Sequence, residues 1–353
     1  MAIKGEQLIA AAQKAAKWIV SRQTERGNYI GNEEPDSNGF YPDTHDVGCY
    51  YKSIFFLQSA GETLAAARAI NYVVESFMSP KGDFFNKPDN RTSGSYTPTY
   101  CQLYPNMWLM RAAASMEWTG LTEKIFQFIL KHRDPETGGI YSSINPKTDI
   151  IDSNSTGYGI LMCLLAGRLD LAIQSAELIL RLIREQPEPT ERFYLRWTRN
   201  NGFQTDLVNI PEKHRVYAVL DAKKPKQAYW CWGWPMNGLI KLYLKTQEER
   251  FLKAAIDIYD FLASCHEHAF HFVTAGKDGW GSSMLYRITG DKRYLKTSLS
   301  QMDFILSCQQ KDGWMLGPAS TSFEDQPLRT TYDFTADFGS WLIGTSMELA
   351  GRE

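Results

Sequence analysis

The sequence predicts an all-α protein, a single (α/α)6 barrel of alternating outer and inner helices over residues 1–353. Helical segments alternate with glycine-rich, aromatic loops about six times along the chain, which we treat as a weak internal repeat. The first helix of each pair is amphipathic, and the second is apolar or small nearly all round. Strand signals are sparse, with short extended pieces expected near 216–221 and 270–274. One long insertion, at about 186–228, joins the fourth outer helix to the fourth inner helix.

The outer helices are predicted from apolar residues that recur at three- and four-residue spacing, with charges on the opposite face. They are expected at 7–21, 62–76, 121–131, 169–185, 247–264 and 291–308. The inner helices carry few charges, which is typical of helices buried on most sides. They are expected at 47–58, 105–116, 155–165, 235–246, 280–288 and 335–349. An amphipathic ring around a buried ring is the pattern of this barrel.

The loops that follow the outer helices share a polar–glycine turn and then an aromatic or apolar residue. They lie at 22–29, 80–85, 134–141 and 309–314, and the last contains Lys311-Asp312-Gly313-Trp314. We expect the glycine to supply a positive φ and the next side chain to pack into the helix ring. Each loop is therefore predicted to be a structural staple.

The composition narrows the partners and the compartment. The net charge is −2 and the basic residues are scattered, which argues against nucleic acid. The 10 Trp, 18 Tyr and 18 Phe predict a cavity lined by aromatic faces, suited to an apolar small-molecule substrate. The six cysteines are far apart and the N-terminus has no apolar signal core, so we expect a cytoplasmic protein. No apolar run is long enough to span a membrane, while peripheral membrane contact and the oligomeric state stay open.

Residues 332–341 read Tyr-Asp-Phe-Thr-Ala-Asp-Phe-Gly-Ser-Trp and give the strongest chemical signal. They place two carboxyl groups, Asp333 and Asp337, one turn apart at the expected start of an apolar helix, with no obvious cationic partner nearby in sequence. Helix capping accounts for one of the two but not for both. Two carboxyl groups in one dry site cannot both ionise cheaply, so one keeps its proton. Such an acid could protonate an alkene.

The stretch 333–337 resembles the acid motif of class II terpene cyclases. That motif reads Asp-x-Asp-Asp-Thr-Ala in bacterial squalene–hopene cyclases and Asp-Cys-Thr-Ala-Glu in oxidosqualene cyclases, and the loop 309–314 is similar to the QW repeats of the family. Asp333 matches the proton-donating Asp and Asp337 matches the Glu, whereas Thr331 stands where the bacterial motif has its first Asp. Since the chain has room for one helical domain, the resemblance is to the single-domain meroterpenoid cyclases. It implies cyclisation of a polyprenyl chain with an aromatic-acid head group, without metal or cofactor.

Aromatic side chains near the inner-helix ends are the predicted substrate contacts, because aromatic faces stabilise a cation by roughly 0.5–2 kcal/mol each. For any single one of them, packing in the core is the alternative. The candidates, with one amide as a polar anchor, are Trp108, Tyr158, Trp230, Trp232, Trp234, Trp280, Phe334, Phe338, Trp341 and Asn106.

Residues 43–46, Asp-Thr-His-Asp, are a second candidate group. In a closed ring the first and last inner helices are neighbours, so His45 or Asp46 could hydrogen-bond the Asp333–Asp337 pair and tune its acidity. The alternative is a helix cap at Asp46 with a satisfied core histidine beside it.

Two further groups carry weaker signals. Cys265, His266, His268 and His271 lie close in sequence, but their spacing fits no common zinc pattern, so we expect no metal. The basic residues of the insertion either face solvent or hold an anionic head group. These are Arg196, Arg199, His214 and Arg215.

Two other functions compete with the cyclase. One is an (α/α)6 glycoside hydrolase or sugar epimerase that uses paired carboxylates, with Asp46 and Asp152 as candidates. The other is a non-catalytic carrier of an apolar ligand. Sugar sites need charged and amide groups on the inner helices, and the sequence shows those helices as mostly apolar. The polarity of the inner helices therefore favours the cyclase.

Overall fold

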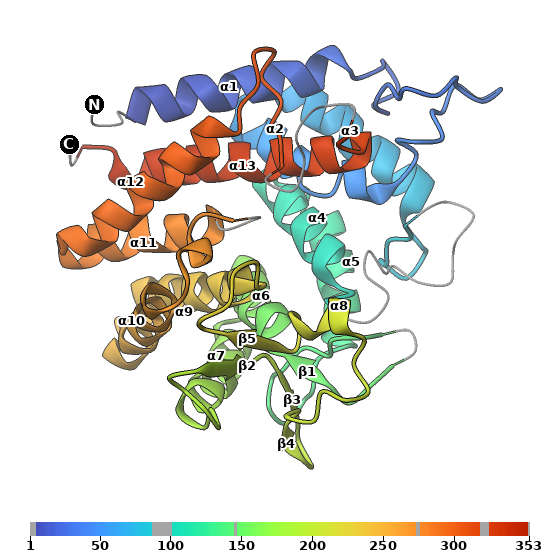
Figure 1. Ribbon diagram of the computed structural model, residues 1–353. Coiled ribbons are helices and arrows are strands. Elements are labelled where there is room, and N and C mark those ends of the chain that lie inside the picture. Colours follow the sequence, from blue (N-terminus) through green and yellow to red (C-terminus); the bar gives the residue numbers. More distant parts are fainter. Residues whose placement is uncertain (1–4, 87–100, 145–146, 273–275, 318–324, 352–353) are drawn as a thin grey trace. The chain divides into compact units, whose positions relative to one another are not determined.

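The computed structural model describes residues 5–86, 101–144, 147–272, 276–317 and 325–351. The chain divides into two compact units. Unit 1 comprises Met1–Tyr96, Tyr104–Phe128 and Ser298–Glu353, and unit 2 comprises Thr97–Leu103 and Ile129–Thr297. Both are mainly helical over the described residues, as predicted (Figure 1). The single domain over 1–353 stays a prediction.

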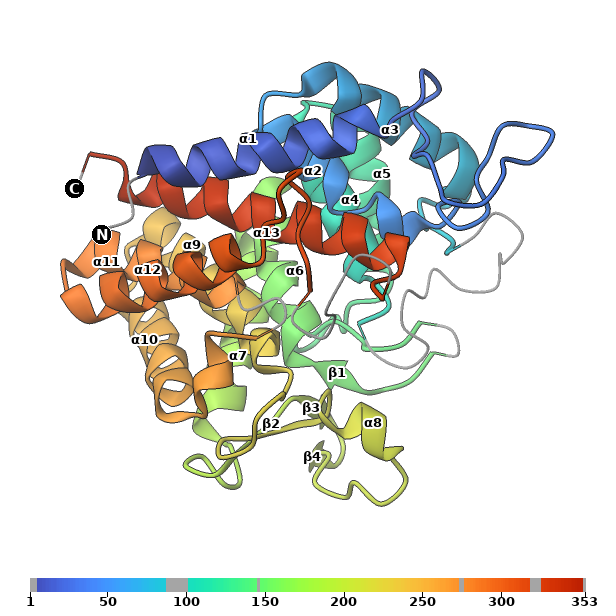
Figure 2. The same ribbon diagram turned by 45° about the horizontal axis from the view of Figure 1, so that its top comes forward.

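Unit 1 is built from alternating amphipathic and buried helices. α1 (Gly5–Ser21) lies alongside α13 (Leu328–Leu349) in both views (Figures 1 and 2). α1 buries one apolar face, whereas α13 is buried along nearly its whole length. The other elements are η1 (Val47–Cys49), α2 (Ser53–Ser59), α3 (Thr63–Phe77), α4 (Tyr104–Ser115), most of α5 (Thr119–Leu130) and most of α12 (Lys292–Ser307).

Unit 2 repeats the alternation. The buried helices α6 (Ser153–Leu165), α9 (Gly233–Thr246) and α11 (Gly276–Thr289) contact one another in that order, and the amphipathic α7 (Leu169–Arg184) and α10 (Glu249–Ser264) pack on α6 and α9. The 3-10 turns η2 (Tyr229–Trp232) and η3 (Glu267–Ala269) precede α9 and follow α10.

Short strands occupy the long insertion of unit 2. β2 (Arg192–Tyr194) pairs antiparallel with β5 (Val219–Asp221), and β3 (Arg196–Thr198) pairs with both β1 (Ile151–Asp152) and β4 (Gly202–Phe203). The short helix α8 (Glu212–Arg215) lies between β4 and β5. β5 falls within the piece predicted near 216–221, whereas the described residues 270–272 form no strand.

Two buried helices depart from their predicted limits. The last one begins at Leu328, directly after Pro327, rather than at residue 335. Asp333 and Asp337 therefore lie inside the helix and not at its start, because the proline and not the acidic residue marks the beginning. The predicted helix 47–58 is instead the turn η1 followed by α2, with Lys52 just before α2.

The glycine loops are staples, as predicted. Gly27, Gly82 and Gly313 have φ values of +95°, +90° and +109°. A Cβ on them would lie 2.2 Å from the carbonyl oxygen of Arg68, 2.7 Å from that of Lys124 and 2.5 Å from that of Lys14, respectively. Each glycine thus presses its backbone against the backbone of another amphipathic helix, which leaves no room for a side chain.

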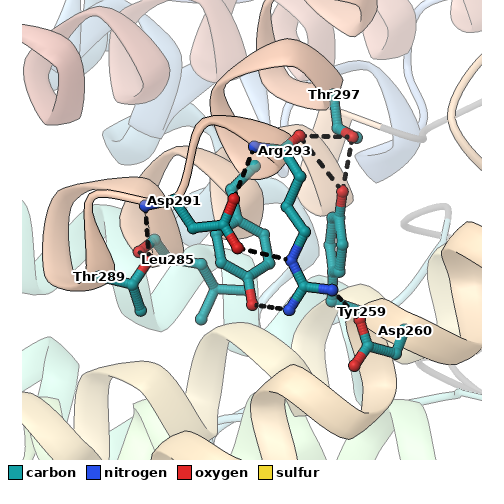
Figure 3. A network of polar contacts seen from close by, with 8 residues as sticks. Tyr259, Asp260, Leu285, Thr289, Asp291, Arg293 and Thr297 are labelled. Atoms are coloured by element: carbon teal, nitrogen blue, oxygen red, sulfur yellow. Dashed lines mark hydrogen bonds and ion pairs between the residues drawn. The ribbon is translucent and has the colours of Figure 1, made fainter.

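A polar network in unit 2 connects α10 to the start of α12 (Figure 3). The guanidinium group of Arg293 lies 2.8 Å from the carboxylate of Asp260 and 2.9 Å from that of Asp291. The Tyr259 hydroxyl shares a 2.7 Å hydrogen bond with the hydroxyl of Thr297. Because the charged groups are half exposed, each ion pair contributes roughly 0–1 kcal/mol, so the network orients the two helices more than it stabilises them.

The staple predicts a large difference between two glycine substitutions in unit 1. Gly313→Ala should lower the free energy of unfolding by about 2–5 kcal/mol, since it adds a backbone clash to the cost of a positive φ. Gly61 has a φ of +88° but nothing within 4 Å of a built Cβ, so Gly61→Ala is the matched control. It should cost only the about 1–2 kcal/mol of the left-handed conformation. Urea unfolding measures both, and equal losses would contradict the staple.

Candidate functional site

In unit 1, the side chains of Asp333 and Asp337 share one cation. The Nζ atom of Lys52 lies 3.1 Å from an oxygen of each carboxyl group. The Lys52 side chain is 3% exposed and those of the two aspartates are 11% and 0% exposed. An ammonium group this close favours carboxylate over carboxylic acid, whereas the predicted chemistry needs an uncharged acid.

The remaining unit 1 candidates have structural partners. Asp46 caps η1 by accepting a 2.7 Å hydrogen bond from the backbone N–H of Gly48, and it also accepts one of 3.1 Å from Nε of Arg329. The imidazole Nδ1 of His45 shares a hydrogen bond with the Tyr72 hydroxyl, and its ring stacks on Phe40 at 4.7 Å. Asp46 thus fits the alternative reading of a helix cap.

The aromatic candidates are mostly core. Trp108 and Trp341 meet edge to face at 5.9 Å, and Phe334 stacks on Phe338 at 5.6 Å. The Asn106 amide donates to the backbone of Gly82 and to the Asp83 carboxylate, in one of the staple loops.

In unit 2, the aromatic candidates also pack among their neighbours. Tyr158 and Trp234 stack in parallel with ring centres 3.8 Å apart. Trp232 lies against Phe193. The other two contacts are Trp230 with Tyr217, and Trp280 with the Lys241 ammonium group.

The first turns of the buried helices in unit 2 are rich in polar groups. The prediction that inner helices are mostly apolar is therefore wrong for these turns, and it was the argument against a sugar site. The buried polar residues at or near the beginnings of α6, α9 and α11 are Asp152, Ser153, Asn154, Ser155, Thr156, Asn237, Lys277, Asp278, Ser282 and Ser283.

Asp152 is the N-cap of α6 and keeps one oxygen free. Its Oδ1 accepts a 2.6 Å hydrogen bond from the backbone N–H of Ser155 and a 3.6 Å contact from the thiol of Cys101. Its Oδ2 is buried and has no hydrogen-bond partner among the described residues. Burial raises the pKa of Asp152 above its ordinary value of 3.8, and the Ser155 hydrogen bonds and the Arg196 charge limit the rise.

Asp278, in the first turn of α11, is fully buried. Neither carboxyl oxygen has a hydrogen-bond partner in the described part of the chain. A Cβ on Gly233 would lie 2.5 Å from its Oδ1, so the glycine at the start of α9 makes room for this side chain. Burial raises the pKa of Asp278 well above 3.8, against the opposing charge of Lys277. Asp278 is therefore a carboxylic acid that can keep its proton near neutral pH.

Arg196 and Cys231 complete this group of unit 2, which we call the Asp152–Asp278 cluster (Asp152, Arg196, Cys231, Lys277 and Asp278). Arg196 stands directly opposite Asp152 in the register of β1 and β3. Its Nε and Nη2 are buried without a hydrogen-bond partner among the described residues. The charges of the other four residues all act on the Cys231 thiol, whose pKa is raised, chiefly by burial, so Cys231 is a thiol and no thiolate nucleophile.

The other basic and histidine candidates serve local roles. Arg199 forms a surface ion pair with Glu136, and Nε of Arg215 donates to the backbone oxygen of Ile210. His266 accepts a hydrogen bond from the backbone of His268.

Three residues of the two charged groups were missed or undervalued from sequence. Lys52 lies far from Asp333 in the chain, and nothing local marks it. Asp278 stands in a run of small residues, Gly-Lys-Asp-Gly-Trp-Gly-Ser-Ser at 276–283, and this unusual helix start was the available signal. Arg196 was noted only as one of four basic residues of the insertion.

The comparisons with known proteins point to carbohydrate enzymes. The model of the β-L-arabinofuranosidase GH127 catalytic domain matches residues 194–303. A search of curated proteins found no match. The fold is similar to a D-mannose isomerase, with 16% identity over 98% of this chain and 97% of that one and a TM-score of 0.73. It is also similar to a GH76 α-mannanase of Bacteroides thetaiotaomicron, with 12% identity, 98% and 97% coverage and a TM-score of 0.66.

These similarities confirm the predicted all-α, (α/α)6 barrel fold. They contradict the resemblance to class II terpene cyclases, the cyclase activity and the apolar polyprenyl substrate, because the matched proteins are glycoside hydrolases and a sugar isomerase. The physical reason lies in α13, where the matched motif is inside the helix and beside Lys52. Among the described helices, none combines the length and apolar character that crossing a bilayer requires.

The shared cation in unit 1 predicts a strong dependence of stability on Lys52. Lys52→Met should lower the free energy of unfolding by about 3–5 kcal/mol, because it leaves two close carboxylates buried without their partner. Adding Asp337→Asn to that variant should recover part of the loss. Lys17→Met, on the exposed face of α1, is the control and should change stability by less than about 0.5 kcal/mol. A loss no larger than the control's in Lys52→Met would show that the pair is not held by this lysine.

Proposed function

We propose that the chain is a carbohydrate-active enzyme, in the first place a glycoside hydrolase, whose acid–base chemistry is carried by Asp278 and Asp152. The observation that supports this most is a pair of buried carboxyl groups whose surroundings differ. Asp278 has no donor among the described residues, whereas Asp152 accepts from Ser155 and faces Arg196. Two carboxyl groups with separated pKa values are what acid and base roles require.

The environments assign the roles. Asp278 is the general acid, because burial holds its proton in place. Asp152 is the general base, because a backbone N–H and the nearby guanidinium group favour its charged form. In hydrolysis, Asp278 gives its proton to the glycosidic oxygen as the C–O bond breaks. Asp152 takes a proton from the water that adds to the sugar carbon.

The comparisons support the same part of the chain. The GH127 model covers residues 194–303, a range that includes Arg196, Cys231 and Asp278. The GH76 enzymes supply a second set of glycoside hydrolases with a similar fold. The first turns of α6 and α11 supply the buried polar groups that a sugar, with its many hydroxyls, would need.

A sugar isomerase is the second candidate. It is favoured by the D-mannose isomerase structure, whose TM-score of 0.73 over 98% of the chain exceeds that of the α-mannanase. In that reaction Asp152 would carry a proton between adjacent sugar carbons, and Asp278 would protonate the carbonyl oxygen. Product analysis separates the two, because isomerisation keeps the mass of a free sugar whereas hydrolysis splits a glycoside by adding water.

The assignment predicts which carboxyl groups matter for turnover. The test incubates the protein with panels of glycosides and free sugars and follows the products by chromatography. Asp278→Asn and Asp152→Asn should each lower kcat/KM by about 10²-fold or more, as loss of a general acid or base does. Asp170→Asn, at an exposed ion pair with Arg168 in the same unit, should leave it unchanged. Full activity in both cluster variants, or no turnover of any sugar by the wild type, would contradict the proposal.

The raised pKa of Asp278 also predicts a stability effect. Its pKa in the folded protein lies above the ordinary value of 3.8, so stability falls as pH rises from about 4 through the folded pKa. Asn cannot ionise, so Asp278→Asn should be more stable than the wild type at pH 8 and gain less at pH 5. For Asp170, the pKa is lowered by the hydrogen bond from Arg168, so Asp170→Asn should show no such gain. Thermal unfolding across this pH range measures the difference, and a gain in both variants or in neither would refute the account.

A further inference from the structure

Arg196 is a buried guanidinium group with unused donors. Its residue is 5% exposed, and its Nε and Nη2 atoms have no hydrogen-bond partner among the described residues. Its backbone is fixed in β3, where the carbonyl oxygen accepts from the N–H of Gln204. The arginine is therefore held in place but not used up.

The nearest acidic residue does not use these donors. Asp152 lies opposite Arg196 in the β1–β3 register, yet its Oδ2 is also buried and without a hydrogen-bond partner in the described part of the chain. A charged donor and a carboxyl acceptor that are neighbours but not bonded leave a gap in the hydrogen bonding of the site. Buried polar groups are normally satisfied, so the gap calls for a ligand or ordered water.

The geometry of the free donors selects the ligand. Nε–H and Nη2–H lie on the same edge of the guanidinium plane and point in parallel, which matches the two oxygens of a carboxylate. A neutral sugar hydroxyl could accept only one of them well.

The charge of the cluster agrees. Lys277 is 1% exposed and close enough to Asp278 and Cys231 to act on both. Because burial raises the pKa of Asp278 well above 3.8 and that of Asp152 above it, the two cations are not fully balanced by negative charge. A site with an excess of positive charge favours an anionic ligand.

We propose that the site takes an acidic sugar, a uronic acid unit, and that Arg196 binds its carboxylate through Nε and Nη2. This rests on the proposed function and names its substrate class. The carboxylate of the sugar would occupy the free edge of Arg196 and set the orientation in which Asp278 and Asp152 reach the reacting bond.

The test compares matched pairs of sugars in binding and in turnover. Binding of D-glucuronate, D-mannuronate, D-glucose and D-mannose is measured by calorimetry, and inorganic sulfate tests whether any anion suffices. Turnover is measured with glucuronides and mannuronides against the corresponding glucosides and mannosides. The variants are Arg196→Gln, Arg196→Lys and the control Arg181→Gln, whose half-exposed guanidinium group lies over the ring of Trp197, next to Arg196 in the chain.

The wild type should bind at least one uronate about 10-fold more tightly than its neutral counterpart and prefer the matching uronide in kcat/KM. Arg196→Gln should weaken uronate binding and turnover by about 100-fold and leave neutral sugars nearly unchanged. Arg196→Lys should lie between, since it keeps the charge but loses the paired donors. Arg181→Gln should behave like the wild type. If Arg196→Gln does not fold, the wild-type comparison and Arg196→Lys still decide.

Each other outcome has a definite reading. Neutral glycosides turned over as well as uronides would overturn the acidic-sugar inference and leave the proposed function standing. Uronate binding that depends on Arg196, without turnover of any sugar, would support the binding site and contradict the enzyme. Sulfate binding as tight as uronate binding, or uronate binding unchanged in Arg196→Gln, would refute recognition of a carboxylate by this residue.

Discussion

A carboxyl group buried in a helical core must be paired with a cation or keep its proton, and this constraint organises both units. In unit 1, Asp333 and Asp337 are paired with Lys52. In unit 2, Asp278 has no hydrogen-bonded partner among the described residues and holds its proton instead. The same residue type therefore does different work, since a clamped carboxylate fixes two helices whereas a free carboxylic acid can give up a proton.

The contrast separates structural from chemical groups. Lys52 offsets the cost of burying Asp333 and Asp337, so their place is in the packing of α2 against α13. The Asp152–Asp278 cluster leaves several buried polar atoms unsatisfied, which costs stability and is tolerated most readily where a ligand completes the hydrogen bonds. Gly233 belongs to the same arrangement, because only a residue without a side chain leaves space for Asp278.

The fold could be predicted from sequence because its signals are local. Three- and four-residue spacing located the amphipathic helices, and the polar–glycine turns located the staples. The site could not, because its partners are distant in sequence, as Lys52 is from Asp333. A five-residue resemblance at 333–337 outweighed the buried polar first turns of α6 and α11, which average hydrophobicity conceals. Asp152 was recognised only as a candidate of the sugar-enzyme alternative, which the comparisons support better.

The protonation state of Asp278 tests the central claim most directly. Infrared difference spectra of the wild type minus Asp278→Asn at pH 7 isolate the carbonyl stretch of this one side chain, and exchange into D2O identifies it by its isotope shift. The account predicts the band of a protonated carboxylic acid, which disappears on substitution and is unaffected in Asp170→Asn. Loss of an ionised carboxylate band in its place would contradict it, since Asp278 would then have no proton to donate.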